Sequence, residues 1–179
     1  MEFFELIKER RSIRRFKKQA IEEEKLKKIL EAANSAPSAG NLQSYDIYLI
    51  KSLDKKSKIS YAALNQPSLI NADILLVFCA NPKKVTSKYG GRGTDLYCIQ
   101  DATIACTYAQ LAATDLGLAS VWVGAFYETK VAEIIGADPE LDRPVAILTL
   151  GYPDEKPTKS ARRPLKDLVH EEKEDKKQK

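Results

Sequence analysis

The feature that most constrains the fold is a long alanine-rich segment in the second half of the chain. Residues 94–116 have helical periodicity, and Gly117 follows them at a place where glycine commonly ends a helix. Small side chains along the segment let another element pack closely against it: Ala102, Ala105, Ala109, Ala112 and Ala113. We therefore predict that 94–116 is the central helix of the core. The same surface could also pack on a partner subunit.

The other apolar patterns predict helices and strands on both sides of this segment. Helical spacing predicts helices just before Arg10, between Ile21 and Pro37, at 54–64 and at 128–135. Short apolar runs predict strands at 45–50, 73–80, 119–126 and 144–150. The run at 73–80 is continuously apolar, so we predict that both of its faces are buried. The glycine-rich residues 83–93 lack the spacing of a nucleotide loop, and we predict a mobile segment beside a site.

One short stretch near the N-terminus concentrates positive charge. It reads Arg10-Arg11-Ser12-Ile13-Arg14-Arg15-Phe16. Guanidinium groups bind phosphate oxygens in pairs, and a serine hydroxyl adds a neutral donor. We expect Phe16 to anchor the end of the stretch in the core, so that the arginines hold a small dianion at a fixed place. A solvated basic patch is the alternative interpretation.

Composition narrows the classes of function. The net charge of +4 is small and spread along the 179 residues, so it gives little support to nucleic-acid binding. No apolar run approaches the roughly 20 residues that a membrane span needs, and the N-terminus has no signal-peptide pattern. We expect a soluble, cytoplasmic protein with one domain at 1–169 and a charged, disordered tail at 170–179.

The single histidine and the three cysteines exclude several kinds of catalytic site. His170 lies in the charged tail, whereas a Ser-His-Asp hydrolase or a histidine-based zinc site needs a histidine held in a cleft. Cys79, Cys98 and Cys106 have no C-x-x-C spacing and fit buried apolar positions, with a reactive thiol as the alternative. We expect no metal site, so the chemistry of an enzyme built from this chain would depend on a cofactor.

A long polar loop connects the second predicted helix to the first strand. It reads Ser35-Ala36-Pro37-Ser38-Ala39-Gly40-Asn41-Leu42-Gln43. Such a loop exposes backbone N–H groups and short polar side chains with little steric bulk. It is longer than a helix-to-strand connection needs, which favours a role in a site over a plain connection.

Five motifs, in this order, resemble the FMN-dependent nitroreductase family over residues 2–169. They are R-R-S-x-R-x-F at 10–16, A-P-S-x-x-N-x-Q at 36–43, G-L-A-S-V-W-V-G at 117–124, G-Y-P at 151–153, and a basic pair before Pro164-Leu165. The resemblance implies an α+β fold with a central, mostly antiparallel sheet flanked by helices. It also implies an intertwined homodimer with two FMN sites at the subunit interface.

The resemblance further implies which residues bind FMN. The flavin phosphate and the pyrimidine edge would be held by Arg10, Arg11, Ser12 and Arg14, and either Arg162 or Arg163 would close on the phosphate from the tail. The same flavin would be lined from the other subunit by Pro37, Ser38 and Asn41. Its polar edge would meet Asn65, and its N5 and O4 atoms would lie near backbone N–H groups of Val123, Gly124 and Ala125.

The implied reaction needs no acid or base side chain, which agrees with the missing histidine in the predicted core. NADH or NADPH would deliver hydride to flavin N5 and leave before a nitroaromatic, quinone or similar small acceptor enters the same space. Reductive dehalogenation or flavin breakdown on the same fold is an alternative, and a non-enzymatic basic binding module is another. Two departures bear on the acceptor: Gln43-Ser44-Tyr45 stands where the family often has Q-P-W, and the segment between 80 and 94 is short.

Overall fold

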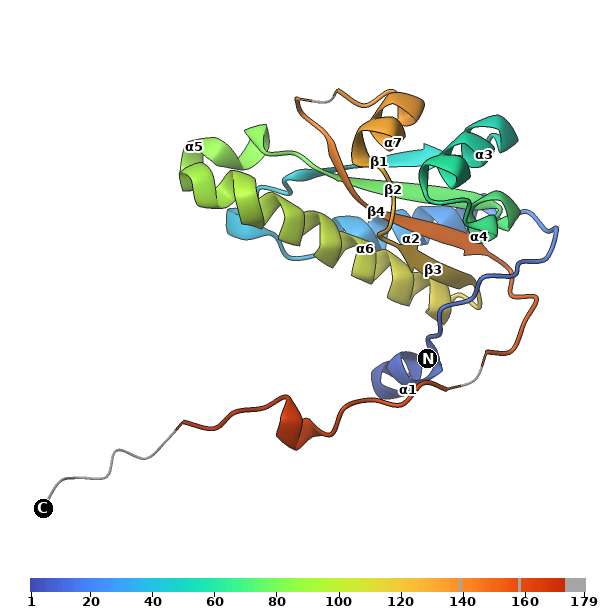
Figure 1. The fold of residues 1–179 in the computed structure, drawn as a ribbon. Coiled ribbons are helices and arrows are strands. Elements are labelled where there is room, and N and C mark those ends of the chain that lie inside the picture. The colour runs from blue at the N-terminus through green and yellow to red at the C-terminus, as the bar shows by residue number, and fades with distance from the viewer. Residues whose placement is uncertain (139, 158, 173–179) are drawn as a thin grey trace, which may run out of the picture.

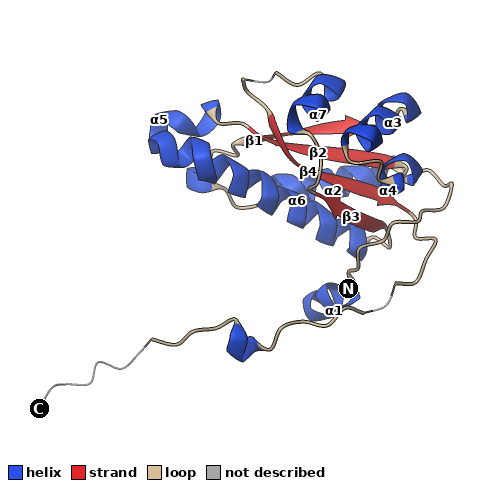
Figure 2. Ribbon diagram, in the orientation of Figure 1, coloured by secondary structure: helices blue, strands red, loops and turns tan. Residues whose placement is uncertain are grey.

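A four-stranded sheet lies between two layers of helices in the computed structural model, which describes residues 1–138, 140–157 and 159–172 (Figures 1 and 2). The strands are β1 (Tyr45–Ile50), β2 (Ile74–Ala80), β3 (Ala119–Val123) and β4 (Arg143–Gly151). They run in the order β1-β2-β4-β3, and every pair is antiparallel. The expected α+β fold with a central antiparallel sheet is confirmed.

Both faces of β2 are buried, as its continuous apolar sequence predicts. Leu76 and Phe78 point into the core on the side of α2 (Glu23–Asn34) and α6 (Cys98–Asp115). Their neighbours Leu75 and Val77 point into a second core. That core is covered by α3 (Leu53–Ala62), α4 (Pro67–Asn71) and α7 (Glu128–Ile135) (Figure 1). All seven residues of β2 are buried because the sheet has a helical layer on each face.

The alanine-rich helix α6 is part of the core, as predicted. It packs on α2 and on the sheet through side chains that are fully buried, among them Ala102, Ala105, Ala109 and Ala113. Gly117 ends it with φ 75°, and the Leu118 N–H donates to the Ala113 carbonyl at 2.8 Å. The segment 94–116 begins with a π-helical turn (Gly93–Tyr97) before α6 proper.

Three local elements differ from what the sequence predicts. Residues 83–92, predicted as a mobile segment, form α5 (Lys83–Arg92), in which Gly90 adopts φ 53° at a kink and Gly93 follows in close contact with Val85. The strand predicted at 119–126 ends at Val123, and the chain then turns so that the Tyr127 N–H donates to the Ala62 carbonyl at 3.0 Å. The short helix α4 was not predicted.

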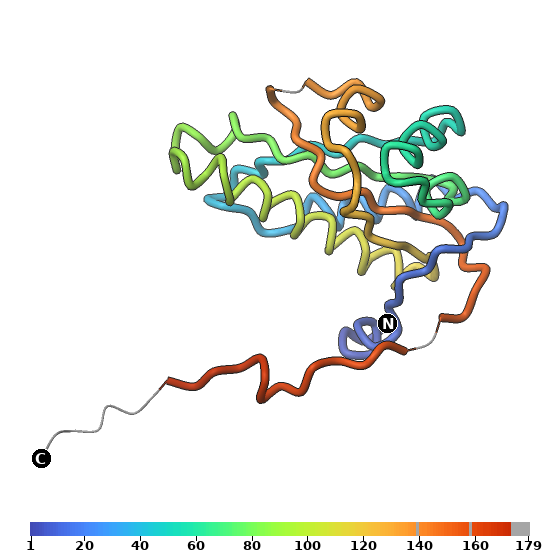
Figure 3. The backbone as a smooth tube through the Cα atoms, viewed as in Figure 1, coloured from blue at the N-terminus to red at the C-terminus, as the bar shows by residue number. Residues whose placement is uncertain are grey.

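The two ends of the chain lie apart from the sheet (Figure 3). Helix α1 (Phe3–Glu9) has no buried residue, and the Met1 ammonium donates to Asp115 at 2.7 Å. After β4 the chain passes α1 and runs outward with a short turn at Leu165–Asp167. Of the tail predicted at 170–179, residues 173–179 lie outside the described residues. No helix in the described ranges combines the length and apolar character needed to cross a bilayer.

Candidate functional site

The arginine segment is fixed to the end of the sheet by its backbone and its apolar side chains. Ser12 pairs with Ser120 of β3, and the Ile13 N–H donates to the Ser120 carbonyl at 3.0 Å. Phe16 is buried, as predicted, and its ring lies so close to Gly151 that a Cβ there would be 2.8 Å from the Phe16 Cδ1 atom. The glycine of the G-Y-P motif therefore makes room for the phenylalanine that anchors the arginine segment.

Five of the predicted ligands, four from the arginine segment and one from the tail, line one cationic cavity of about 650 Å³. Its lining residues come from α1, from the arginine segment and from the tail: Ile7, Lys8, Arg10, Arg11, Ser12, Arg14, Pro157, Lys159, Ser160 and Arg162. Six of these carry a positive charge, and none of them is acidic. Partial burial lowers the pKa of Arg10, and the charges of Arg162 and Arg11 lower it further. A cavity in which cations repel one another in this way is suited to an anion.

The two candidate arginines of the tail differ in position. Arg162 lines the cavity and acts electrostatically on Arg10, whereas Arg163 is exposed and does not line the cavity. Of the two alternatives that the sequence leaves open, the geometry favours Arg162. Arg14 and Arg15 differ in the same way, because Arg14 lines the cavity while the Arg15 guanidinium pairs with Glu155 at 3.3 Å.

The loop with Pro37, Ser38 and Asn41 is held from beneath by one buried carboxylate. Asp101 of α6 is only 2% exposed, and its Oδ1 accepts from the Ala39 N–H at 2.9 Å. Its Oδ2 accepts from the Ser44 N–H at 3.2 Å and from the Ser44 hydroxyl at 2.6 Å. The carboxylate thus holds the loop at two points, at the start of its tip, the 3-10 turn Ala39–Asn41, and at its end at Ser44.

The tip of this loop also touches α5. Gly40 has φ 56°, and a Cβ there would be 2.5 Å from both the Lys88 Nζ and the Tyr89 hydroxyl. Glycine adopts this φ without strain, and a larger residue would also displace the ends of the Lys88 and Tyr89 side chains. Pro37 and Asn41 remain exposed beside it, and Ser38 is half-buried with its Oγ accepting from the Gln43 N–H at 3.0 Å.

A third group of predicted ligands gathers at the end of β3. The Gln66 amide, directly after Asn65, donates to the Ala125 carbonyl at 3.2 Å and to the Ala63 carbonyl at 3.0 Å. Asn65 is exposed with φ 59° and lies close to this contact. Val123 is buried, whereas Gly124 and Ala125 are exposed. The structure therefore brings the neighbour of Asn65 into contact with Ala125, at the end of the segment 123–125.

A single chain does not bring all three groups together. Ser120, which pairs with the arginine segment, is four residues from Gly124, or about 13 Å along a strand. The loop lies at the other end of α6. Asp101, near the start of α6, binds this loop, whereas Thr114, near the end of α6, lines a cleft together with Arg11. Thirteen residues separate Asp101 from Thr114, which corresponds to about 20 Å along the helix. In one chain the residues Pro37–Asn41 are therefore remote from the arginine cavity.

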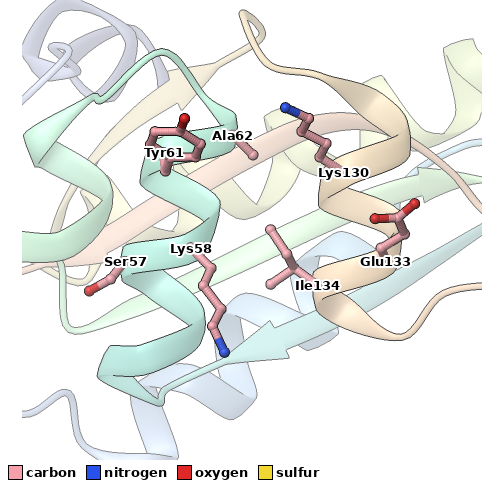
Figure 4. Close-up of a pocket in the computed structure, with 7 residues that line it drawn as sticks. All are labelled: Ser57, Lys58, Tyr61, Ala62, Lys130, Glu133 and Ile134. Carbon is pink, nitrogen blue, oxygen red and sulfur yellow. The ribbon is translucent and has the colours of Figure 1, made fainter.

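A cleft of about 510 Å³ between α3 and α7 lacks the features of a chemical site. Figure 4 shows Ala62 and Ile134 between the two helices, with the Lys58 and Lys130 ammonium groups at opposite ends of the cleft and the Glu133 carboxylate beside α7. Lys58 pairs with Asp54 at 2.7 Å, and the Lys130 ammonium lies 5.0 Å from the centre of the Tyr127 ring. A ligand site normally directs several polar groups inward.

The cysteines have the buried positions that the sequence predicts. Cys79, Cys98 and Cys106 are free and buried, and burial raises the pKa of each thiol. A thiol that stays protonated is a poor nucleophile, so the alternative of a reactive cysteine is not supported.

Sequence reasoning missed two carboxylates that organise these groups, Asp101 and Glu155. Asp101 is one of only two charged residues in α6, and the other, Asp115, is the last residue of the helix, so a charge within the helix could have drawn attention to Asp101. Glu155 follows the G-Y-P motif, but nothing in the local sequence indicates that its partners are Arg14 and Arg15.

Comparison with known proteins gives one consistent result. The profile of the nitroreductase family matches residues 7–81 and 58–152. A protein of Archaeoglobus fulgidus, provisionally named an NADH dehydrogenase/NAD(P)H nitroreductase, is 37% identical over 160 residues, which cover 87% of this chain and 88% of that protein. An FMN reductase [NAD(P)H] of Bacillus subtilis is 30% identical over 184 residues, covering 96% and 74%. The crystal structure of nitroreductase A from Vibrio parahaemolyticus superposes with a TM-score of 0.87 at 29% identity, covering 95% and 75%.

Proposed function

Because this chain belongs to the nitroreductase family, we propose that it is an FMN-dependent NAD(P)H oxidoreductase. The observation that supports this most directly is the cavity lined by Arg10, Arg14 and Arg162. Its donors are guanidinium, ammonium and hydroxyl groups, which suit a terminal phosphate. FMN, when bound, supplies the hydride exchange between the nicotinamide and a small-molecule acceptor.

The chain's own residues bind and orient the flavin in this proposal. Arg10, Arg11, Ser12 and Arg162 hold the phosphate, and Arg14 places a positive charge at the pyrimidine edge. Asn65 meets the polar edge, and the backbone of Val123, Gly124 and Ala125 provides fixed N–H groups that need no titratable side chain. The proximity of Asn65 to 123–125 supports placing these four residues at one end of the flavin.

We also propose that the site is completed by a second copy of the chain. In one copy Pro37, Ser38 and Asn41 lie about 20 Å along α6 from the arginine cavity, so a second subunit must supply them if they line the same flavin. Apolar side chains at both chain ends are exposed in one copy, including Phe3, Phe4, Leu165 and Val169. Residues 1–169 then act as one domain within a homodimer. The cytoplasmic location expected from the sequence stays a prediction.

Reconstitution followed by anaerobic stopped-flow reduction tests the function. We expect the purified protein to bind FMN in preference to FAD, one per subunit, and NADH or NADPH to bleach the bound flavin. Recovery of FAD, or of no flavin after incubation with FMN, would contradict the proposal. Sedimentation velocity at low micromolar concentration tests the dimer, which a folded, flavin-loaded monomer would exclude.

A further inference from the structure

We propose that Glu155 is a positioning residue that gives the arginine segment its flavin-binding shape. It would do so by holding the backbone of Arg14 and Arg15 and by keeping the Arg15 side chain out of the cavity. This inference rests on the proposed function, because it concerns how the phosphate and pyrimidine site is built.

The contacts of Glu155 are concentrated on two consecutive residues. Its Oε1 accepts from the Arg14 N–H and from the Arg15 N–H, the latter at 3.2 Å. Its Oε2 lies 3.3 Å from the Arg15 Nε atom. One carboxylate therefore fixes two adjacent peptide groups, and the direction of the Arg14 side chain follows from that backbone.

The neighbouring backbone explains why a side chain is needed there. Residues 152–154 run antiparallel to residues 15–17: the Lys17 N–H donates to the Tyr152 carbonyl at 2.9 Å, and the Asp154 N–H donates to the Arg15 carbonyl at 3.0 Å. Backbone pairing ends at this point. The Glu155 carboxylate accepts hydrogen bonds from the next two N–H groups, those of Arg15 and Arg14, as side-chain acceptors do at the end of a strand or helix.

The charge of Glu155 is directed away from the proposed anion site. Glu155 does not line the cationic cavity, but lines an adjoining cleft of about 400 Å³ with Glu9, Lys156 and Lys159. The Arg14 N–H is the main cause of its lowered pKa, so the group is ionised at neutral pH. An exposed ion pair such as that with Arg15 contributes little by itself, so the two backbone contacts are the important ones.

Glu155 also holds the start of the tail. Pro157, two residues after it, lines the cavity, and so do Lys159, Ser160 and Arg162. Loss of the Glu155 contacts would leave the backbone pairing of residues 15–17 with 152–154 in place, but it would loosen Arg14 and the start of the tail, which both contribute cations to the same anion site.

The test compares Glu155→Ala and Glu155→Gln with Asp154→Asn as the matched control, since Asp154 is the exposed acidic neighbour. We expect the FMN dissociation constant to rise about tenfold or more in Glu155→Ala, the size of one lost charge-assisted contact. Glu155→Gln should recover part of the affinity, because its amide oxygen can still accept from both N–H groups. Asp154→Asn should bind FMN like the wild type.

A second measurement separates this inference from the proposed function. In the protein without flavin, Glu155→Ala should speed amide hydrogen exchange in a peptide covering residues 10–16, and Asp154→Asn should not. Arg14→Ala should also cost less FMN affinity in the Glu155→Ala background than in the wild type. If the wild type failed to bind FMN the proposed function would fall, while the exchange data would still decide whether Glu155 holds the segment. Unchanged exchange, or equal affinity in all variants of a flavin-binding wild type, would overturn the inference.

Discussion

The two regions proposed to meet at the flavin are supported in opposite ways. The loop 37–44 is bound by Asp101, which belongs to the central helix and is almost completely buried. The arginine segment 10–15 is bound by Glu155, which belongs to the chain after the last strand and has a side chain about one-fifth exposed. One region is therefore part of the core, and the other is assembled from the two ends of the chain.

This difference predicts two classes of mutational effect. Substitution of Asp101 beneath the loop should lower the free energy of unfolding, because the donors of Ala39 and Ser44 lose their acceptor. Changes in the arginine segment and tail should lower flavin affinity with little effect on folding. Arg14 and the tail arginines are exposed, Arg10 and Arg11 are only partly buried, and the ligand gives these side chains their main partner. Each prediction below tests one side of this contrast.

The largest effect is expected at Asp101. In Asp101→Ala the Ala39 N–H, the Ser44 N–H and the Ser44 hydroxyl lose their acceptor, and each unsatisfied buried group costs about 1–3 kcal/mol. We expect destabilisation of about 3 kcal/mol or more for Asp101→Ala, and about 1–3 kcal/mol for Asp101→Asn, which keeps one acceptor. Urea denaturation followed by circular dichroism gives both values.

The matched control is Asp95→Asn. Asp95 is exposed, and its side chain accepts from the neighbouring Thr94 hydroxyl at 3.1 Å. Its substitution should change stability by no more than about 0.5 kcal/mol. Equal midpoints for Asp101→Asn and Asp95→Asn would show that the loop is not held from the core.

The next effect concerns Arg14 and the redox potential of bound FMN. Arg14→Ala should remove a charge that stabilises the reduced, anionic flavin. A charge-assisted contact contributes about 1.5–3 kcal/mol. Since about 1.4 kcal/mol corresponds to roughly 30 mV for a two-electron couple, the midpoint potential should fall by some tens of millivolts. Spectroelectrochemical titration measures the shift.

Arg15→Ala is the control, because Arg15 pairs with Glu155 and does not line the cavity. It should change the potential and the FMN affinity much less than Arg14→Ala does. Equal shifts in the two variants, or a shift in neither, would mean that the segment is only a basic surface.

A smaller effect is expected in the tail. Arg162→Ala should weaken FMN binding about tenfold, because Arg162 lines the cavity together with Arg10. Arg163→Ala should change affinity less than about twofold, since Arg163 lies outside the cavity. Quenching of flavin fluorescence measures both. A greater loss of FMN affinity in Arg163→Ala than in Arg162→Ala would mean that Arg163, and not Arg162, contacts the phosphate.

The parts of the fold that were predictable are those whose causes are local. The bounds of β1 and α7 and the two-sided burial of β2 follow from period and composition. Helix α4 has five residues, too few to show a helical period. Helix α5 was missed because Gly90 and Gly91 are usually helix breakers, whereas here Gly90 adopts φ 53° at a kink within the helix.

The candidate site also has a part that the sequence predicts and a part that it does not. Its arginines and its loop are visible as motifs, but the carboxylates that hold them act across the chain. Asp101 is 62 residues from Ala39, and Glu155 is 140 residues from Arg15. No local pattern indicates such pairs, so the positioning residues emerged only once the fold was known.

The smallest expected effect is a pH dependence of the Glu155 contribution. The backbone N–H groups hold the pKa of Glu155 below its ordinary value of 4.5. A carboxyl group with a lowered pKa contributes fully above its ordinary value, and the contribution is lost as the pH falls through the lowered pKa. The ratio of FMN dissociation constants between Glu155→Gln and the wild type should therefore be constant from pH 7 to about 5 and approach one below about 4.5. The phosphate of free FMN titrates in this range too, and this contribution of the free ligand is common to both proteins and cancels in the ratio. If the ratio already changed between pH 7 and 6, a different group would be titrating. If the ratio were one at every pH, Glu155 would not contribute to FMN binding by the arginine segment.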